Sequence, residues 1–365
     1  MTKSWQDCKN ILVIRADNMG DLIMSAPAIR ALKQTFSAKI TVLTSSMAAG
    51  ISAYLPEIDE VIVFDLPWVK AKTAIASDQI FTLTGLLKQR NFDAAVIFTV
   101  FSQNAMPAAM VAFMAGIPLR LAYSRENPYT LLTHWVPDKE PYNFIRHQVE
   151  RDLFLVNSVG AVTVERQLRL TVPANALENA FAKMMVKGIN VSKPWLIIHA
   201  GVSETKREYP RECWVEAARK LINLNGFQIL FTGVSSEKEL CDYLAEKTGG
   251  QAFSLAGLFQ LEEFIALIDA APLVLSVNTG TVHVAAAVNT PVVVLYAQTN
   301  PQHTPWMVAN KVLEFEVAEA ERSKNEVIQY LYKHHYNPPV SLPRAEDIYN
   351  AAIELLQKTS PKAAG

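Results

Sequence analysis

The stretch that decides the fold is ILVIRADNMGD, residues Ile11–Asp21. Its first part, Ile11–Arg15, is short, mostly apolar and rich in β-branched residues, which is typical of a strand buried on both faces of a parallel sheet. A polar loop that contains Gly20 follows, and a helical stretch then extends to about Phe36. This order predicts the first βα unit of a parallel α/β sheet.

The same pattern recurs in both halves of the chain. The predicted strands are Lys39–Thr44, Glu60–Asp65 and Asp93–Phe98 in the first half, and Trp195–His199, Phe227–Thr232, Pro272–Val277 and Pro291–Tyr296 in the second. Helix-like segments separate them, so each half is predicted to be a Rossmann-like, doubly wound α/β domain. Between the halves the alternation weakens, and we expect a helix over His147–Ser158 and a short strand over Leu168–Val172.

The predicted domain organisation has four parts. An N-terminal Rossmann-like domain covers residues 1–175, a linker covers 176–193, a second Rossmann-like domain covers 194–340, and a last helix lies within 341–365. Two such domains in one chain place ligands where the carboxyl ends of both sheets face each other across a cleft. Candidate site residues should therefore lie just after strands.

Composition excludes several classes of protein. The chain has 365 residues, 50% hydrophobic and 19% charged, as expected for a globular protein of two domains. Its net charge of −1 gives no bias towards nucleic acid or an anionic membrane. Its three cysteines lie far apart, which argues against a disulfide framework. The N-terminus lacks the apolar segment of a signal peptide, and no apolar run reaches the roughly 18–20 residues that span a bilayer. We therefore expect a cytoplasmic protein.

The first candidate site is the loop after the opening strand, where two interpretations of Asp21 remain open. Asp21 stands where the next helix begins, so it could cap that helix. It could equally be a carboxylate that acts as a general base, with Asp17 as the competing carboxylate. We expect Arg15, Asn18 and Gly20 to support this loop or to line the acceptor side.

The second candidate site is the loop His199–Pro210, which follows the first strand of the second half. It has small residues and ends in the adjacent cations Lys206 and Arg207, which suit a diphosphate in a partly desolvated site. The alternative is a solvated Lys-Arg pair in front of a helix.

The third candidate site is a polar glycine turn that leads into a helix. Its residues are Asn278, Thr279, Gly280, Thr281 and His283. The free backbone N–H groups at such a helix N-terminus bind phosphate. A lone histidine in the first turn can equally have a structural role.

The sequence predicts no metal site and no nicotinamide site. His199, His283 and His303 show no metal-ligand spacing, and no carboxylate cluster supports them. The chain has no GxGxxG after its first strand, no GxxxxGK[ST] and no GxSxG.

Together these segments resemble glycosyltransferase family 9, the ADP-heptose:lipopolysaccharide heptosyltransferases, over about residues 10–310. The resemblance lies in Gly20-Asp21 followed by Pro27, in Arg207, Tyr209, Pro210 and Trp214, and in Asn278–Pro291 with Thr299-Asn300-Pro301. It implies the GT-B fold, with the acceptor on the N-terminal domain, the nucleotide sugar on the C-terminal domain, and a last helix that returns to the N-terminal domain. It also implies an inverting, metal-independent sugar transfer that needs no cofactor.

The resemblance implies a role for each candidate residue. Asp21 becomes the general base, and Arg207 or Lys206 becomes the phosphate cation. Thr279, Gly280 and Thr281 become backbone contacts to the diphosphate, and Glu237 is expected to reach the nucleoside. The partners implied are a nucleotide sugar and a saccharide acceptor. Nucleic acid is not among them, and a membrane is met only peripherally, at the inner face of the cytoplasmic membrane, through a lipid-linked acceptor.

One departure from the family pattern keeps other functions open. The family usually has aspartate where this chain has Asn278, so the charge is lost while the shape is kept. A weakened or non-catalytic sugar-nucleotide-binding protein is therefore one alternative. A nucleotide-sugar epimerase, which also has two Rossmann-like halves, is the other.

Overall fold

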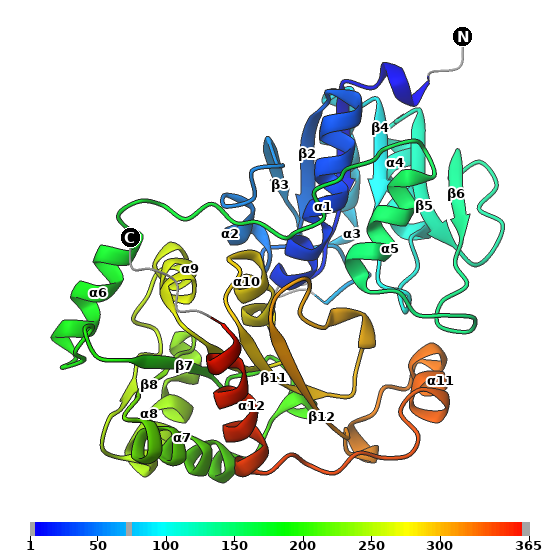
Figure 1. Cartoon of the computed structure of the whole chain (residues 1–365). Helices are drawn as coiled ribbons and strands as arrows, with labels where there is room; N and C mark the ends of the chain where they lie inside the picture. Colours follow the sequence, from blue (N-terminus) through cyan, green and yellow to red (C-terminus); the bar gives the residue numbers. More distant parts are fainter. Residues whose placement is uncertain (1–3, 71–74, 360–365) are drawn as a thin grey trace. The chain divides into compact units, whose positions relative to one another are not determined.

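The structure is a computed structural model that describes residues 4–70 and 75–359. The chain divides into two compact units, residues 1–169 and 170–365, which run from blue to green and from green to red in Figure 1. The end of the predicted last segment, residues 360–365, lies outside the described residues.

The first unit is built on a parallel sheet of six strands in the order β3-β2-β1-β4-β5-β6. This is the strand order of a Rossmann fold. The strands are β1 (Asn10–Ile14), β2 (Lys39–Thr44), β3 (Glu60–Val63), β4 (Ala94–Ile97), β5 (Leu119–Ser124) and β6 (His134–Pro137). The helices are α1 (Met19–Phe36), α2 (Ala49–Ser52), α3 (Ser77–Gln89), α4 (Met106–Met114) and α5 (Gln148–Asn157). Helix α1 packs against α5, and α3 packs against α4.

The second unit repeats this design, with the parallel order β12-β11-β10-β7-β8-β9. Its strands are β7 (Trp195–His199), β8 (Gln228–Phe231), β9 (Ala252–Ser254), β10 (Val274–Val277), β11 (Val292–Ala297) and β12 (Asn310–Phe315). Its helices are α6 (Ala176–Val186), α7 (Arg211–Asn225), α8 (Lys238–Thr248), α9 (Leu261–Ala270), α10 (Gly280–Ala287), α11 (Glu326–His334) and α12 (Ala345–Lys358). The prediction of two doubly wound domains is thus confirmed.

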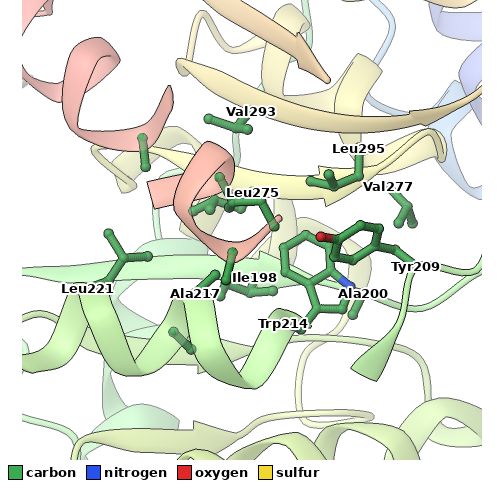
Figure 2. Close-up of a cluster of buried hydrophobic side chains, with 14 of the residues drawn as sticks. Ile198, Ala200, Tyr209, Trp214, Ala217, Leu221, Leu275, Val277, Val293 and Leu295 are labelled. Atoms are coloured by element: carbon green, nitrogen blue, oxygen red, sulfur yellow. The ribbon is translucent and has the colours of Figure 1, made fainter. Parts of the chain in front are cut away.

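Trp214 lies at the centre of the core on one face of this second sheet. Figure 2 shows its indole ring beside Tyr209, among apolar side chains of β7, β10 and β11. The two rings meet edge to face, with centroids 5.3 Å apart. Tyr209 also donates its hydroxyl hydrogen to the carbonyl of Pro343, just before α12. This contact ties the loop of the second candidate site to the last helix.

Two details of the predicted organisation are corrected. The segment Leu168–Val172 forms no strand, although it is apolar at alternate positions. Helix α12 buries Ile348, Ala352 and Leu355 in the core of the second unit, against α7, β11 and β12. Its apolar stripe is thereby used within that unit, in place of the predicted return to the N-terminal domain.

The predicted linker also contains structure of its own. Helix α6 occupies most of residues 176–193 and packs against α9. None of the helices in the described residues combines the length and the hydropathy that a membrane span requires.

Candidate functional site

Each sheet has one position where the chain changes its direction of winding. These switch points lie between β1 and β4 in the first unit and between β7 and β10 in the second. Loops at the carboxyl ends of the strands diverge there, and open α/β sheets bind their ligands at that place. Asp17 and Asp21 follow β1, while His199 ends β7 and Asn278 follows β10. The structure therefore brings the candidate residues of each unit to its switch point.

In the first unit, a buried guanidinium group faces two carboxylates. The Arg15 side chain is completely buried, and its Nη2 lies 3.1 Å from Oδ1 of Asp21. Its Nε lies 3.4 Å from Oδ2 of Asp17. Asp17 also accepts a hydrogen bond of 2.5 Å from Nε2 of Gln103, which follows β4. Burial raises the pKa of Asp17, although Arg15 opposes this shift.

Asp21 fulfils the capping interpretation without excluding the catalytic one. Its Oδ2 accepts a hydrogen bond of 3.2 Å from the backbone N–H of Asn18, the N-cap of α1, while Oδ1 accepts from Arg15. A carboxylate has about four acceptor positions, so a cap of the helix and a contact with a substrate hydroxyl are compatible roles for one side chain. Gly20 is the second residue of α1 and not part of the preceding loop, which corrects its predicted place.

A third carboxyl group, Asp152 of α5, belongs to the same cluster and was missed by the sequence analysis. It accepts hydrogen bonds of 2.7 Å from Oγ of Ser25 and 2.8 Å from Nε2 of Gln148. Burial raises its pKa to about 6, although the Arg15 charge acts in the opposite direction. Asp152 lies 131 positions after Asp21 (152 − 21), so no local motif could have revealed it.

Asp152 makes the stability of the protein depend on pH. Because its pKa is raised in the folded state, its contribution to stability is fully present below the unfolded value of about 4 and is lost as pH rises through about 6. Asp152→Asn should abolish this loss, about 2–3 kcal/mol in the free energy of unfolding. Urea denaturation of both proteins at pH 4.5, 6 and 7.5 measures it. A constant difference between them at all three values would contradict the assignment.

A hollow of about 250 Å³ lies at the carboxyl ends of β5 and β6 in the first unit. The guanidinium of Arg146 is held there between two rings, 4.1 Å from the centroid of Phe144 and 4.2 Å from that of Phe154. Both rings are partly exposed, and the buried Tyr123 also lines the hollow. A guanidinium group at a concave surface offers several N–H donors, which suit the hydroxyl groups of a sugar. None of the residues that line this pocket was predicted to belong to a site.

In the second unit, a pocket of about 350 Å³ opens at the carboxyl ends of β7, β8 and β9. It is lined by His199, Thr232, Gly233, Phe259 and Phe264, among others. Burial lowers the pKa of His199 to about 4, so this imidazole is neutral near pH 7. A partly apolar pocket with a neutral imidazole and a hydroxyl suits an uncharged ring such as a nucleobase.

Glu237 lies over two glycines at the rim of this pocket. A Cβ on Gly201 would approach Oε1 of Glu237 to 2.1 Å, and a Cβ on Gly233 would approach Oε2 to 2.7 Å. Both glycines are therefore needed to make room for the carboxylate. Oε2 accepts a hydrogen bond of 2.8 Å from the N–H of Val234, and burial raises the Glu237 pKa. The predicted nucleoside contact thus lies beside a pocket.

Lys206 and Arg207 are brought together by one acid. Their side chains lie 3.0 and 3.6 Å from Oε2 of Glu204. Arg207 also donates a hydrogen bond of 3.2 Å to the carbonyl oxygen of Asn278. Both cations are about three-quarters buried. Arg207 is the one that reaches the turn before α10.

Helix α10 begins at this turn, as predicted. Thr279 is its N-cap, and Gly280 and Thr281 are its first two residues. The Thr279 side chain makes no capping hydrogen bond. His283 is the fourth residue of α10, and its side chain is buried. Its ring meets the ring of His303 edge to face, with the centroids 6.2 Å apart. In the described part of the chain, no group of three histidine, cysteine or acidic residues is placed to hold a metal ion.

Comparison with known proteins identifies the family. The family model for glycosyltransferase family 9 (heptosyltransferase) matches residues 80–335. Lipopolysaccharide heptosyltransferase 2 of Salmonella typhimurium is 28% identical over 307 residues, which cover 81% of this chain and 84% of that protein. The crystal structure of a family 9 glycosyl transferase from Veillonella parvula superposes with a TM-score of 0.77 at 19% identity, covering 98% of this chain and 100% of the other.

The structure of E. coli ADP-heptose lps heptosyltransferase II has a TM-score of 0.69 at 22% identity, with coverage of 96% and 99%. Both structural matches extend over the two Rossmann-like units, so the fold is GT-B. The family model matches more than two thirds of this chain. The chain therefore belongs to glycosyltransferase family 9 and is a glycosyltransferase.

Proposed function

We propose that the chain transfers heptose from ADP-heptose onto a saccharide of the lipopolysaccharide core, with inversion at the anomeric carbon and without a metal ion. The observation that carries this proposal is the arrangement at the second switch point. There Arg207 reaches the turn that opens α10, and the nucleoside-sized pocket lies on the neighbouring strand ends. The names of the relatives, which are heptosyltransferases of lipopolysaccharide, support the sugar and the acceptor.

The second unit supplies the donor site in this proposal. The pocket lined by His199 and Phe264 takes the adenine ring, and Glu237 accepts hydrogen bonds from the ribose. The backbone N–H groups of α10 and the guanidinium of Arg207 bind the diphosphate, and Lys206 adds a second charge. These groups stabilise the negative charge that grows on the leaving diphosphate, which is the task of a metal ion in other transferases.

The first unit supplies the base. An acceptor hydroxyl attacks the anomeric carbon while Asp21 removes its proton, and the carbon–oxygen bond to the diphosphate breaks. Arg15 and the N–H of Asn18 fix the orientation of this carboxylate. A single displacement of this kind inverts the configuration. The pocket around Arg146 is available for another ring of the acceptor.

Family membership favours transfer over the epimerase alternative. It also favours transfer over the other alternative from the sequence, a non-catalytic sugar-nucleotide-binding protein. Turnover separates the two. Release of ADP from ADP-heptose that depends on a heptose-deficient lipopolysaccharide acceptor supports the transferase, whereas tight ADP binding without turnover on any core acceptor supports the binding protein. Contact with a membrane is proposed only through the lipid-linked acceptor, on the cytoplasmic side.

The donor site makes a quantitative prediction about its two cations. Arg207→Ala should weaken ADP binding about tenfold or more, because it removes a charge-assisted contact worth roughly 1.5–3 kcal/mol. Lys206→Ala should have a smaller effect, because its ammonium is directed to Glu204 and not to the α10 turn. Calorimetric titration of ADP, GDP, UDP and NAD into both variants and the parent measures this.

Arg211→Ala is a suitable control for this titration. Arg211 begins α7, and its guanidinium lies 5.7 Å from the ring centroid of Tyr243, away from the α10 turn. Its loss should leave ADP affinity unchanged. A larger loss for Lys206→Ala than for Arg207→Ala would transfer the phosphate role to Lys206, and selective binding of NAD would contradict the proposed function.

A further inference from the structure

Asn278 is buried and uses its side-chain amide as if it were a further peptide group of the sheet. Strands β10 and β11 are paired up to Val277 and Leu295, and Asn278 is the next residue after β10. Its Oδ1 accepts a hydrogen bond of 3.2 Å from the N–H of Ala297, and its Nδ2 donates one of 3.2 Å to the carbonyl of the same residue. Nδ2 also donates to Oγ1 of Thr299 at 3.2 Å.

These hydrogen bonds require an amide. An amide offers a donor and an acceptor side by side, whereas an ionised carboxylate only accepts. Ala297 is completely buried, so its carbonyl would lose a partner if residue 278 were an aspartate. A carboxylate oxygen would then face a carbonyl oxygen in a site with little water, which is unfavourable for both groups.

The backbone of Asn278 links these hydrogen bonds to the donor site. Its carbonyl oxygen accepts the hydrogen bond from Nη1 of Arg207, and the next residue, Thr279, is the N-cap of α10. Holding Asn278 against β11 therefore fixes both the acceptor of Arg207 and the direction of the first N–H groups of α10.

We infer that Asn278 is a positioning residue whose amide, by pairing with both backbone groups of Ala297, holds Arg207 and the α10 N-terminus in place for the donor diphosphate. The inference rests on the proposed function, because it takes the diphosphate as the ligand of this turn. It gives Asn278 a structural reason, because an aspartate at this position would weaken the site.

The test is ADP binding by Asn278→Asp and Asn278→Ala, measured by calorimetry from pH 5.5 to pH 8.5 as a ratio to the parent. At pH 8.5 the aspartate variant should bind at least tenfold more weakly. As pH falls and the new carboxyl group gains a proton, it can again donate to Ala297, so the ratio should approach one. The alanine variant should be weaker at every pH by a constant factor.

The charged and titratable groups around the turn include Arg207 and Lys206 with their shared partner Glu204, His199 from β7, Tyr296 from β11 and the His283–His303 pair. The parent carries the same groups, so the ratio cancels their titration and that of ADP. Asn325→Asp is the matched control, because the Asn325 side chain accepts only, from the N–H of Val327 at 2.9 Å. Its ratio should stay near one.

A double variant tests the link to Arg207. If Asn278 acts through Arg207, the aspartate substitution should cost markedly less in an Arg207→Ala background than in the parent. Thermal unfolding of each variant accompanies the titrations, and a lower midpoint at pH 8.5 that recovers at pH 5.5 is the same effect expressed as stability.

An aspartate variant that binds ADP as well as the parent at all pH values overturns the inference, as does a loss that does not change with pH. Failure of the parent itself to bind ADP would instead contradict the proposed donor site, so the two failures are distinguishable.

Discussion

Replacing Asp21 with asparagine is expected to lower kcat for sugar transfer by about 10²- to 10⁴-fold, the usual contribution of a positioned general base. Asparagine keeps the shape of the side chain, and its oxygen can still accept from the N–H of Asn18. It cannot take the proton of the acceptor hydroxyl. ADP affinity should stay at the parent value, because Asp21 belongs to the first unit and the donor residues to the second. Steady-state turnover and ADP calorimetry separate the two effects.

Asp17→Asn is the control for this experiment. Asp17 faces the same guanidinium, but burial raises its pKa and Gln103 already donates to it at 2.5 Å. We expect that Asp17 helps to hold Arg15, and that Asp17→Asn lowers kcat less than tenfold. A larger loss for Asp17→Asn than for Asp21→Asn would make Asp17 the base and Asp21 the cap of α1.

The sequence predicted those parts of the fold that local patterns encode. Strands β1, β2, β4, β7, β10 and β11 are central or nearly so, and their apolar runs follow from burial on both faces. The edge strands β6, β9 and β12 were missed because their residues are largely half-exposed or exposed, so no continuous apolar run marks them.

Strand β5 was missed for a different reason. It contains Arg120, a charged residue that is buried and donates to the carbonyl oxygens of Ile117, Thr130 and Leu131. A buried arginine that is satisfied by backbone carbonyls interrupts the apolar pattern without disturbing the sheet. Only the surrounding loop, which the sequence does not place in space, reveals why it is tolerated.

The residues of the candidate site likewise fall into those that the sequence could place and those that it could not. Asp21, Arg207 and the Asn278–Thr281 turn lie in the segments that follow predicted strands, so their place near the strand ends could be inferred. Asp152 and Arg146 lie on or next to α5, a helix whose sequence shows only its amphipathic pattern. Asp152 joins its cluster only because α5 packs against α1, a contact between distant parts of the chain. The role of Asn278 could be inferred only from its two hydrogen bonds to the backbone of Ala297, which exist only in the folded β10–β11 pair.

Arg15→Met should have the second large effect, because it removes the positive charge that faces the buried carboxyl groups Asp17, Asp21 and Asp152. Methionine preserves much of the buried volume, so the loss is mainly electrostatic. Breaking a buried ion pair on one side costs about 3–5 kcal/mol in the free energy of unfolding. Transfer activity should fall as well, since the Asp21 carboxylate loses the group that orients it.

The effect of Arg15→Met on stability must depend on pH, and its sign follows from the carboxyl groups. Burial already raises the pKa of Asp17, and that of Asp152 to about 6, while Arg15 holds both down. Without Arg15 both pKa values rise further, so the folded variant keeps its protons to higher pH and loses stability as pH rises through these values. The destabilisation measured by urea should therefore be larger at pH 8 than at pH 5. In an Asp21→Asn background the same substitution should cost less, because one of the carboxylates is gone. A cost that is equal at both pH values, and equal in both backgrounds, would mean that Arg15 acts through packing and not through its charge.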